Sequence, residues 1–165
     1  MAIRSVALAG MVADTSLYNI DGACVVGGAT EIPVGVAVKV STLEPLFDGH
    51  KSVTATGITA NAAYGVVVRS HYETPDGTAK AKTAVNVMTA GRIWMRTNLT
   101  VAPKLGTAVL VNSTGVVVEN EAAGGVATGW TFAGGFIPAK TAAGAMPTQG
   151  DSVDGPLVEV QVKQK

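Results

Sequence analysis

The chain has 165 residues, a length typical of one domain, and its twelve basic and twelve acidic residues leave a formal net charge of zero. No block of like charge is present, which argues against electrostatic binding to bare nucleic acid, because that requires a clustered basic surface. Valine, with 25 residues, outnumbers leucine, with 8, and this excess of β-branched residues favours strands over helices.

The N-terminal segment carries little hydrophobic periodicity. It holds small residues and an isolated apolar patch at Leu17, Tyr18 and Ile20. A segment of this kind is either an arm that orders against a partner or an edge strand packed on its own domain, and the sequence leaves both open. We therefore divide the chain into residues 1–32, an N-terminal arm or edge segment, and residues 33–165, a β-domain.

Clear strand patterns begin just after this boundary. Four valines alternate with small or polar residues over 34–40, which predicts a half-buried strand. After a Thr-rich run over 53–59, the segment 64–72 contains three consecutive valines, which predicts a strand buried on both faces. The tetrapeptide Thr-Pro-Asp-Gly at 74–77 then predicts a tight turn.

The most ordered stretch runs from Val85 to Val118, where short alternating segments are separated by turn signals. Its joint at Thr89-Ala90-Gly91 has two interpretations. It is either a three-residue hairpin or one long strand that is kinked at a glycine bulge.

Two further strands are expected near the C-terminus. One covers 126–132 and presents Trp130 and Phe132 on one side, and the other covers 157–163 with strict alternation. A long loop rich in Gly, Ala and Pro is expected between them, over 133–152. Eight or nine short strands, without a helix of three turns, predict an all-β fold. We expect a compact β-barrel or β-sandwich of short, mostly antiparallel strands, with an extended N-terminal arm.

The sequence contains no convincing catalytic or metal-binding arrangement. His50 and His71 have no zinc-site spacing to each other or to Cys24, the single cysteine. Ser70 and His71 are adjacent, and adjacent residues of a strand point to opposite faces, so they do not form a nucleophile and base pair. No run approaches the roughly 20 apolar residues of a membrane helix. We expect no catalytic residue, no metal and no cofactor, and an enzyme is the weakest hypothesis.

Arg92, Trp94 and Arg96 share one face of a predicted strand. Arg and Trp are enriched at the energetic centres of interfaces. Either this face contacts a partner, or Trp94 belongs to the core and Ile93 and Met95 point outward, and both orientations indicate association. We expect charge reversal at the two arginines to weaken attachment and to leave the fold intact. The candidate partner interface consists of Leu17, Tyr18, Ile20, Arg92, Trp94 and Arg96.

The order of five segments in this chain resembles that of the capsid cement (decoration) proteins of tailed bacteriophages. The segments are GVAVKVS, AYGVVVRSHYE, VNVMTAGRIWMRT, APKLGTAVLVNSTGVVV and a final strand in DGPLVEVQVK. The similarity covers about residues 33–163, and residues 1–32 show no recognisable match. It implies a structural virion protein that binds the outside of an icosahedral head, bridges neighbouring major capsid subunits and stabilises the shell.

The resemblance also implies the partners and the location. The partner would be the major capsid protein, and the protein would sit on the capsid exterior after assembly in the host cytoplasm, as a homo-oligomer (dimer or trimer) without nucleic acid or membrane partners. A charged fraction of 15% is low for a free monomer and fits a covered surface. The alternative is a carbohydrate-binding or adhesion module on a virion or cell surface, with a shallow aromatic groove around Trp130 and Phe132.

Overall fold

The computed structural model describes four stretches of the chain, 7–41, 49–70, 77–139 and 152–163. Within them the fold is all-β, as the sequence predicts, apart from one short 3-10 helix. His71 and most of the turn expected at 74–77 lie outside the described residues.

Eleven strands are formed by the described residues, more than the eight or nine expected, because three of them are only two residues long. The elements are β1 (Val12–Val26), β2 (Ile32–Pro33), β3 (Ala37–Val40), β4 (Lys51–Thr54), β5 (Gly65–Val67), β6 (Thr78–Ala79), β7 (Ala84–Arg96), β8 (Ala108–Val111), β9 (Val117–Val118), the 3-10 helix η1 (Glu121–Ala123), β10 (Val126–Ile137) and β11 (Leu157–Val162). No helix in these stretches is long and apolar enough to cross a membrane.

Nine of the strands form one sheet, and one part of this sheet closes on itself into a barrel. The strand order is β1-β4-β3-β5-β7-β11-β10-β8-β9, and β1 also pairs with β7. This additional pairing joins β1, β4, β3, β5 and β7 into a ring, which we call the first barrel. All its pairings are antiparallel except that of β1 with β4.

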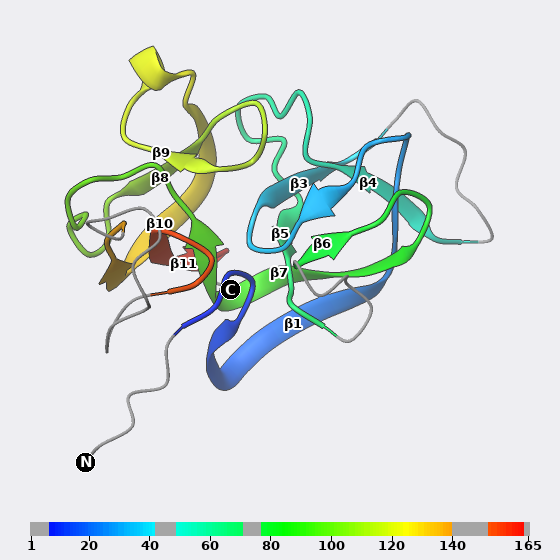
Figure 1. The fold of residues 1–165 in the computed structure, drawn as a ribbon, viewed down its shortest axis with the longest axis horizontal. Helices are drawn as coiled ribbons and strands as arrows, with labels where there is room; N and C mark the ends of the chain where they lie inside the picture. Colours follow the sequence, from blue (N-terminus) through cyan, green and yellow to red (C-terminus); the bar gives the residue numbers. More distant parts are fainter. Residues whose placement is uncertain (1–6, 42–48, 71–76, 140–151, 164–165) are drawn as a thin grey trace.

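The other four strands of this sheet form a second barrel with β7, whereas β2 and β6 pair in a separate two-stranded sheet. β11, β10, β8 and β9 follow β7 in antiparallel order, and a bridge between Thr97 and Val117 closes the ring. The Thr97 hydroxyl and the Asn98 amide both donate to the Val117 carbonyl and so fix this closure. In Figure 1, β8 to β11 lie at the left, β3 to β6 lie at the right, and β7 runs between the two groups.

β7 belongs to both barrels because it changes partners at Gly91. Its first half pairs with β5 and with most of β1, whereas residues 91–96 pair with β11. Gly91 has a φ of 119°, which a residue with a side chain rarely adopts. β7 is therefore one long strand kinked at Gly91, as one of the two sequence-based interpretations predicted, and the hairpin interpretation is wrong.

The two main core clusters follow from this arrangement. One fills the second barrel with residues such as Ile93, Met95 and Trp130, and the other fills the first barrel, where Val67 and Val87 are buried. Val66 belongs to the cluster of the second barrel although it neighbours Val67. β5 is thus buried on both faces, as the three consecutive valines at 66–68 predicted, although only the first two belong to the strand.

Several predicted boundaries differ from the observed ones. The half-buried strand expected over 34–40 begins only at Ala37, because 34 and 35 form a turn, and Ala37 on its expected solvent face is fully buried. The strand expected within 64–72 covers only Gly65–Val67 of the described residues.

β10 continues to Ile137, so the first part of the loop expected over 133–152 is a strand that pairs with β11. The segment 12–26, which the sequence left open between an arm and an edge strand, forms β1 and pairs with β4 and β7. Gly134 and Gly135 interrupt the strand pattern in the second half of β10, so the sequence did not reveal it. The irregular register of β1 with β7 interrupts the pattern over 12–26 in the same way.

Candidate partner-binding site

The most exposed part of β1 is a bulge of four residues, Thr15 to Tyr18, which we call the β1 bulge. Asp14 pairs with Arg92 and Asn19 pairs with Ala90, so these four residues stand opposite a single residue of β7. All four are exposed, and Leu17 and Tyr18 expose 78% and 47% of their surfaces. Apolar side chains of this size on a protruding segment are typical of a contact surface.

Local interactions explain why the chain leaves the sheet here. The Asp14 carboxylate accepts a hydrogen bond of 2.8 Å from the Ser16 amide, which starts the turn outward. This bond also holds the pKa of Asp14 below its ordinary value. At the far end the Asn19 side chain donates to the Thr89 hydroxyl at 2.7 Å. Gly91 makes room beneath, because a Cβ there would lie 2.7 Å from the Cβ of Tyr18.

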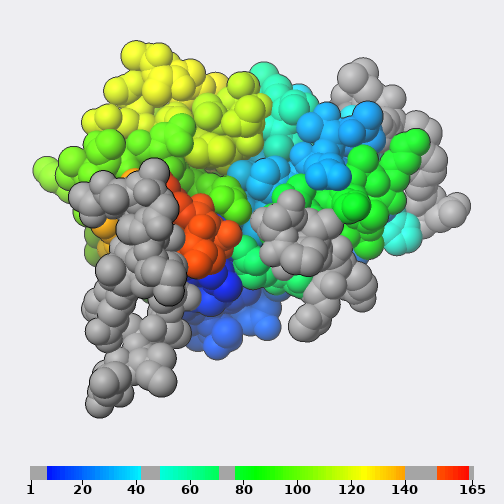
Figure 2. Space-filling model, in the orientation of Figure 1, coloured from blue at the N-terminus to red at the C-terminus, as the bar shows by residue number. Residues whose placement is uncertain are grey.

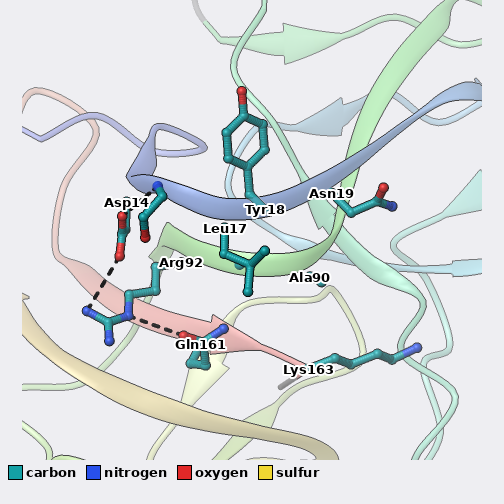
Figure 3. A pocket seen from close by; sticks show the side chains of 10 residues that line it. Asp14, Leu17, Tyr18, Asn19, Ala90, Arg92, Gln161 and Lys163 are labelled. Carbon is teal, nitrogen blue, oxygen red and sulfur yellow. Dashed lines mark hydrogen bonds and ion pairs between the residues drawn. The ribbon is translucent and has the colours of Figure 1, made fainter. Parts of the chain in front are cut away.

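A groove of about 360 Å³ lies between the β1 bulge, β7 and the end of β11. Arg92 spans it, because its Nη1 lies 4.0 Å from Asp14 Oδ2 and its Nε donates to Gln161 Oε1 at 3.2 Å. Figure 3 shows Leu17 directed toward β7 and Tyr18 directed to the opposite side of β1. The lining residues are Asp14, Ser16, Leu17, Tyr18, Asn19, Ala90, Gly91, Arg92, Gln161 and Lys163.

Three of the six predicted interface residues meet at this groove. Leu17, Tyr18 and Arg92 line it, whereas Ile20 is partly buried and packs against the core cluster of the second barrel. Gln161 and Lys163 complete the groove and were missed. Their alternation along 157–163 placed them on an outward face, but only the pairing of β11 with β7 brings them beside Arg92.

Trp94 is partly buried, so it is neither the exposed contact residue nor the fully buried core residue that the sequence left open. Ile93 and Met95 are fully buried, so the outward orientation considered for them is wrong. Trp94 faces the other way but is only partly exposed, since it packs against the first-barrel cluster. A Cβ at Gly135 would lie 2.5 Å from the indole of Trp94, so β10 also approaches this ring. Both faces of β7 are covered here.

The Arg96 guanidinium group forms its contacts within the chain. Its Nε donates to the Val34 carbonyl at 3.0 Å, and its Nη1 donates to the Asp154 carbonyl at 2.8 Å. The Asp154 carboxylate also pairs with Arg69 at 2.7 Å and accepts from the Ala9 amide at 2.9 Å. Charge reversal at Arg96 would therefore disrupt this cluster, unlike the sequence-based expectation that the fold stays intact.

Two features that active sites commonly use, a metal-ligand cluster and an activated cysteine, are absent from the described residues. They contain no group of three or more His, Cys, Asp and Glu residues that could hold a metal ion. Cys24 is buried in the first barrel, and burial raises the pKa of its thiol to about 12, so it stays protonated and unreactive.

The aromatic groove considered for carbohydrate binding is contradicted. Trp130 and Phe132 do share one side of β10, but that side faces the core and exposes only 1% and 6% of these residues. Stacking on a sugar requires an exposed aromatic face, which neither residue provides.

The described fold has two barrels that share β7, and Leu17, the most exposed large apolar side chain among the described residues, lies beside a groove that Arg92 spans, which suits the binding of a partner. Over residues 2–163 the chain matches the family described as structural cement protein (E217 gp24/Pam3 gp6), and it belongs to this family. It is thus a structural protein of the phage virion that stabilises the capsid. The match includes the N-terminal segment, in which the sequence resemblance found nothing recognisable.

A solved structure has a similar fold. A chain in "The capsid of Myoviridae Phage XM1" superposes with a TM-score of 0.63, covers 99% of this chain and 95% of that chain, and shares 16% sequence identity. At this identity the likeness concerns the fold alone. No curated protein sequence matches the chain.

Proposed function

We propose that this protein binds the outside of an icosahedral phage head and bridges neighbouring major capsid subunits. The family match over residues 2–163 is the observation that carries this proposal. A protein that binds assembled capsomers but not separated subunits stabilises the shell by mass action. On this proposal the chain works by binding alone, without a catalytic step and without nucleic acid or membrane partners. It would join the virion in the host cytoplasm.

Bridging requires two contact surfaces, and the chain offers two exposed apolar sites on different barrels. Leu17 and Tyr18 lie on the β1 bulge, and Val101 and Leu105, which expose 74% and 73% of their surfaces, lie on the loop from β7 to β8. β1 lies at the lower edge of Figure 1 and this loop lies at the left, and Figure 2 shows the same separation on the surface. We assign the two sites to two neighbouring capsid subunits.

The proposal is tested with heads from a phage that lacks this chain. Such heads are heated alone and after addition of the full-length protein, and DNA release is followed. We expect heads without the protein to release DNA at a lower temperature, and the added protein to restore heat resistance. Equal survival of bare and decorated heads would show that the protein does not stabilise the shell.

The two surfaces are tested by exchanging one exposed apolar residue at each. Leu17→Ser and Val101→Ser should each weaken binding to heads by about tenfold, because an apolar anchor at an interface contributes about 1–2 kcal/mol. Val153→Ser is the control, since Val153 is also exposed but lies at neither surface. All three variants should keep the unfolding midpoint of the native chain. Light scattering on the same samples tests the predicted dimer or trimer.

A further inference from the structure

We propose that the groove beside the β1 bulge binds an acidic segment of the capsid subunit, with a carboxylate held between Arg92 and Lys163. The inference rests on the proposed function, because the capsid is the partner. It adds the chemistry of the recognised segment, namely a carboxylate next to an apolar side chain.

The charge of the groove favours an anionic occupant. Arg92 and Lys163 are cationic and Asp14 is its only acidic lining residue, which leaves an excess of one positive charge. The pair of Arg92 with Asp14 is long, at 4.0 Å, and its side chains are 47% and 40% exposed, so solvent weakens it. A closer carboxylate would compete with Asp14 for the guanidinium group.

Arg92 and Lys163 both carry N–H groups that form no hydrogen bond with the described residues. Arg92 carries five N–H groups, and its one hydrogen bond within the described residues is from Nε to Gln161. Lys163 is exposed and forms no hydrogen bond or ion pair with the described residues. Figure 3 shows Gln161 between these two side chains, with the Lys163 side chain extended away from Arg92. The flexible four-carbon stem of an exposed lysine lets its ammonium group turn toward a carboxylate that Arg92 holds.

The walls of the groove accommodate an apolar side chain beside that carboxylate. Leu17 and Ala90 contribute apolar surface, and the cavity of about 360 Å³ lies at the small end of ligand sites, which span about 300–1000 Å³. A short peptide stretch fits a space of this size better than a folded surface does.

β1 itself is protected against pairing with a further strand. β4 pairs only with Cys24 to Val26, which leaves the outer edge of the preceding residues without a strand partner in the described part of the chain. The side chains of Asp14 and Asp21 accept hydrogen bonds from the amides of Ser16 and Ala23. These amides are therefore not free for strand addition, and the partner binds through side chains in the groove.

A second copy of this chain fits the groove less well than an acidic segment. In a two-fold contact the same patch meets itself, so the excess positive charge of one copy would face that of the other. Like charges across an interface oppose association. The charge of the groove therefore favours the capsid subunit over self-association.

The test measures binding of full-length variants to heads that lack the native protein, over a range of salt concentrations. Arg92→Glu and Lys163→Glu should each weaken binding by at least about tenfold and should reduce its dependence on salt. Lys80→Glu is the matched control, because Lys80 is exposed but lies on the turn after β6, away from the groove. Its binding should equal that of the native chain, and the unfolding midpoints of all variants should be unchanged.

The outcomes separate this inference from the proposed function. If the native protein binds and stabilises heads and both groove variants bind equally well, the groove is not the acidic contact and only this inference is overturned. If the variants bind heads normally but change the oligomeric state in solution, the groove holds a second copy, which also overturns it. If the native protein does not bind heads, the proposed function fails together with it.

Discussion

The Asp21 side chain on β1 contacts Lys51 on β4 and Tyr64, which directly precedes β5. Its carboxylate accepts a hydrogen bond of 2.8 Å from Lys51 on β4 and a second bond from the Tyr64 hydroxyl. The bonds from Lys51 and Tyr64 lower the pKa of Asp21 to about 2. The ionised carboxylate is thus favoured in the folded protein, and its contribution to stability depends on pH.

The pH dependence of stability follows from this lowered pKa. The stabilisation is fully present above the unfolded value, near 3.8, and is lost as the pH falls through about 2. Asp21→Asn should therefore be less stable than the native chain at pH 7, by about 1 kcal/mol because solvent screens the exposed Lys51. The difference should shrink between pH 4 and pH 2.

Urea unfolding of both proteins across this range measures the effect. Glu119→Gln serves as the control, because Glu119 is exposed and lies just after β9, in the second barrel. A difference between native chain and Asp21→Asn that stays constant from pH 7 to pH 2 would contradict the assignment.

At the scale of elements, the β1 bulge and the kink in β7 depend on each other. Gly91 lets β7 turn from the first barrel into the second, and its missing side chain leaves the space that Tyr18 occupies. The same residue thus positions the wall of the groove.

We expect Gly91→Ala to destabilise the fold by about 2–4 kcal/mol, because the new Cβ combines backbone strain with overlap against Tyr18. Gly28→Ala is the control. Gly28 also has a positive φ, 73°, but a Cβ there meets no atom within 4 Å, so only about 1 kcal/mol of strain is expected. Denaturant unfolding compares the two, and equal losses would show that β1 does not depend on the space above Gly91.

At the scale of the whole molecule, the shared strand couples the barrels. β7 contributes Val87 to one core cluster and Ile93 and Met95 to the other, so neither barrel can lose β7 without opening the other. If the protein bridges capsid subunits as proposed, force passes through its own body, and the continuous strand β7 between the barrels provides that path.

Unfolding should therefore be one cooperative transition. Val53→Ala removes buried atoms in the first barrel and should cost about 2 kcal/mol. The chain has two tryptophans, and Trp94 packs against the first-barrel cluster, so the test is made in a Trp94→Phe background, where Trp130 alone reports on the second barrel. We expect tryptophan fluorescence and circular dichroism to show the same shifted midpoint in this variant. A shift in circular dichroism without one in fluorescence would mean that the barrels unfold separately.

Much of the fold could be predicted because alternation is a local property. The valines of 157–163, and the pair Trp130 and Phe132, face the cores as their spacing indicated, since successive residues of a strand point to opposite faces. Val34, Val36 and Val38 are buried too, but only Ala37–Val40 of that segment is a strand. The irregular hydrophobic pattern of β1 also has a local cause. Four bulge residues break its register, so no periodicity could reveal the strand.

The candidate site was only partly predictable. Residue type alone selected Leu17, Tyr18 and Arg92, because large apolar and guanidinium groups are typical of interfaces. Residue type could not separate Arg92 from Arg96, which lie on the same face of β7. Only the tertiary structure places Asp154 beside Arg96 and leaves Arg92 in the groove.

The sequence by itself determined that this protein is all-β and which side chains of its regular strands point inward. The tertiary structure decided that the strands close into two barrels around β7, that β1 joins them, and that Leu17, Arg92 and Lys163 meet in one groove. The physical reason is the range of the interactions. Side-chain alternation acts between neighbours in the chain, whereas strand register is set by barrel closure among segments that are far apart in sequence.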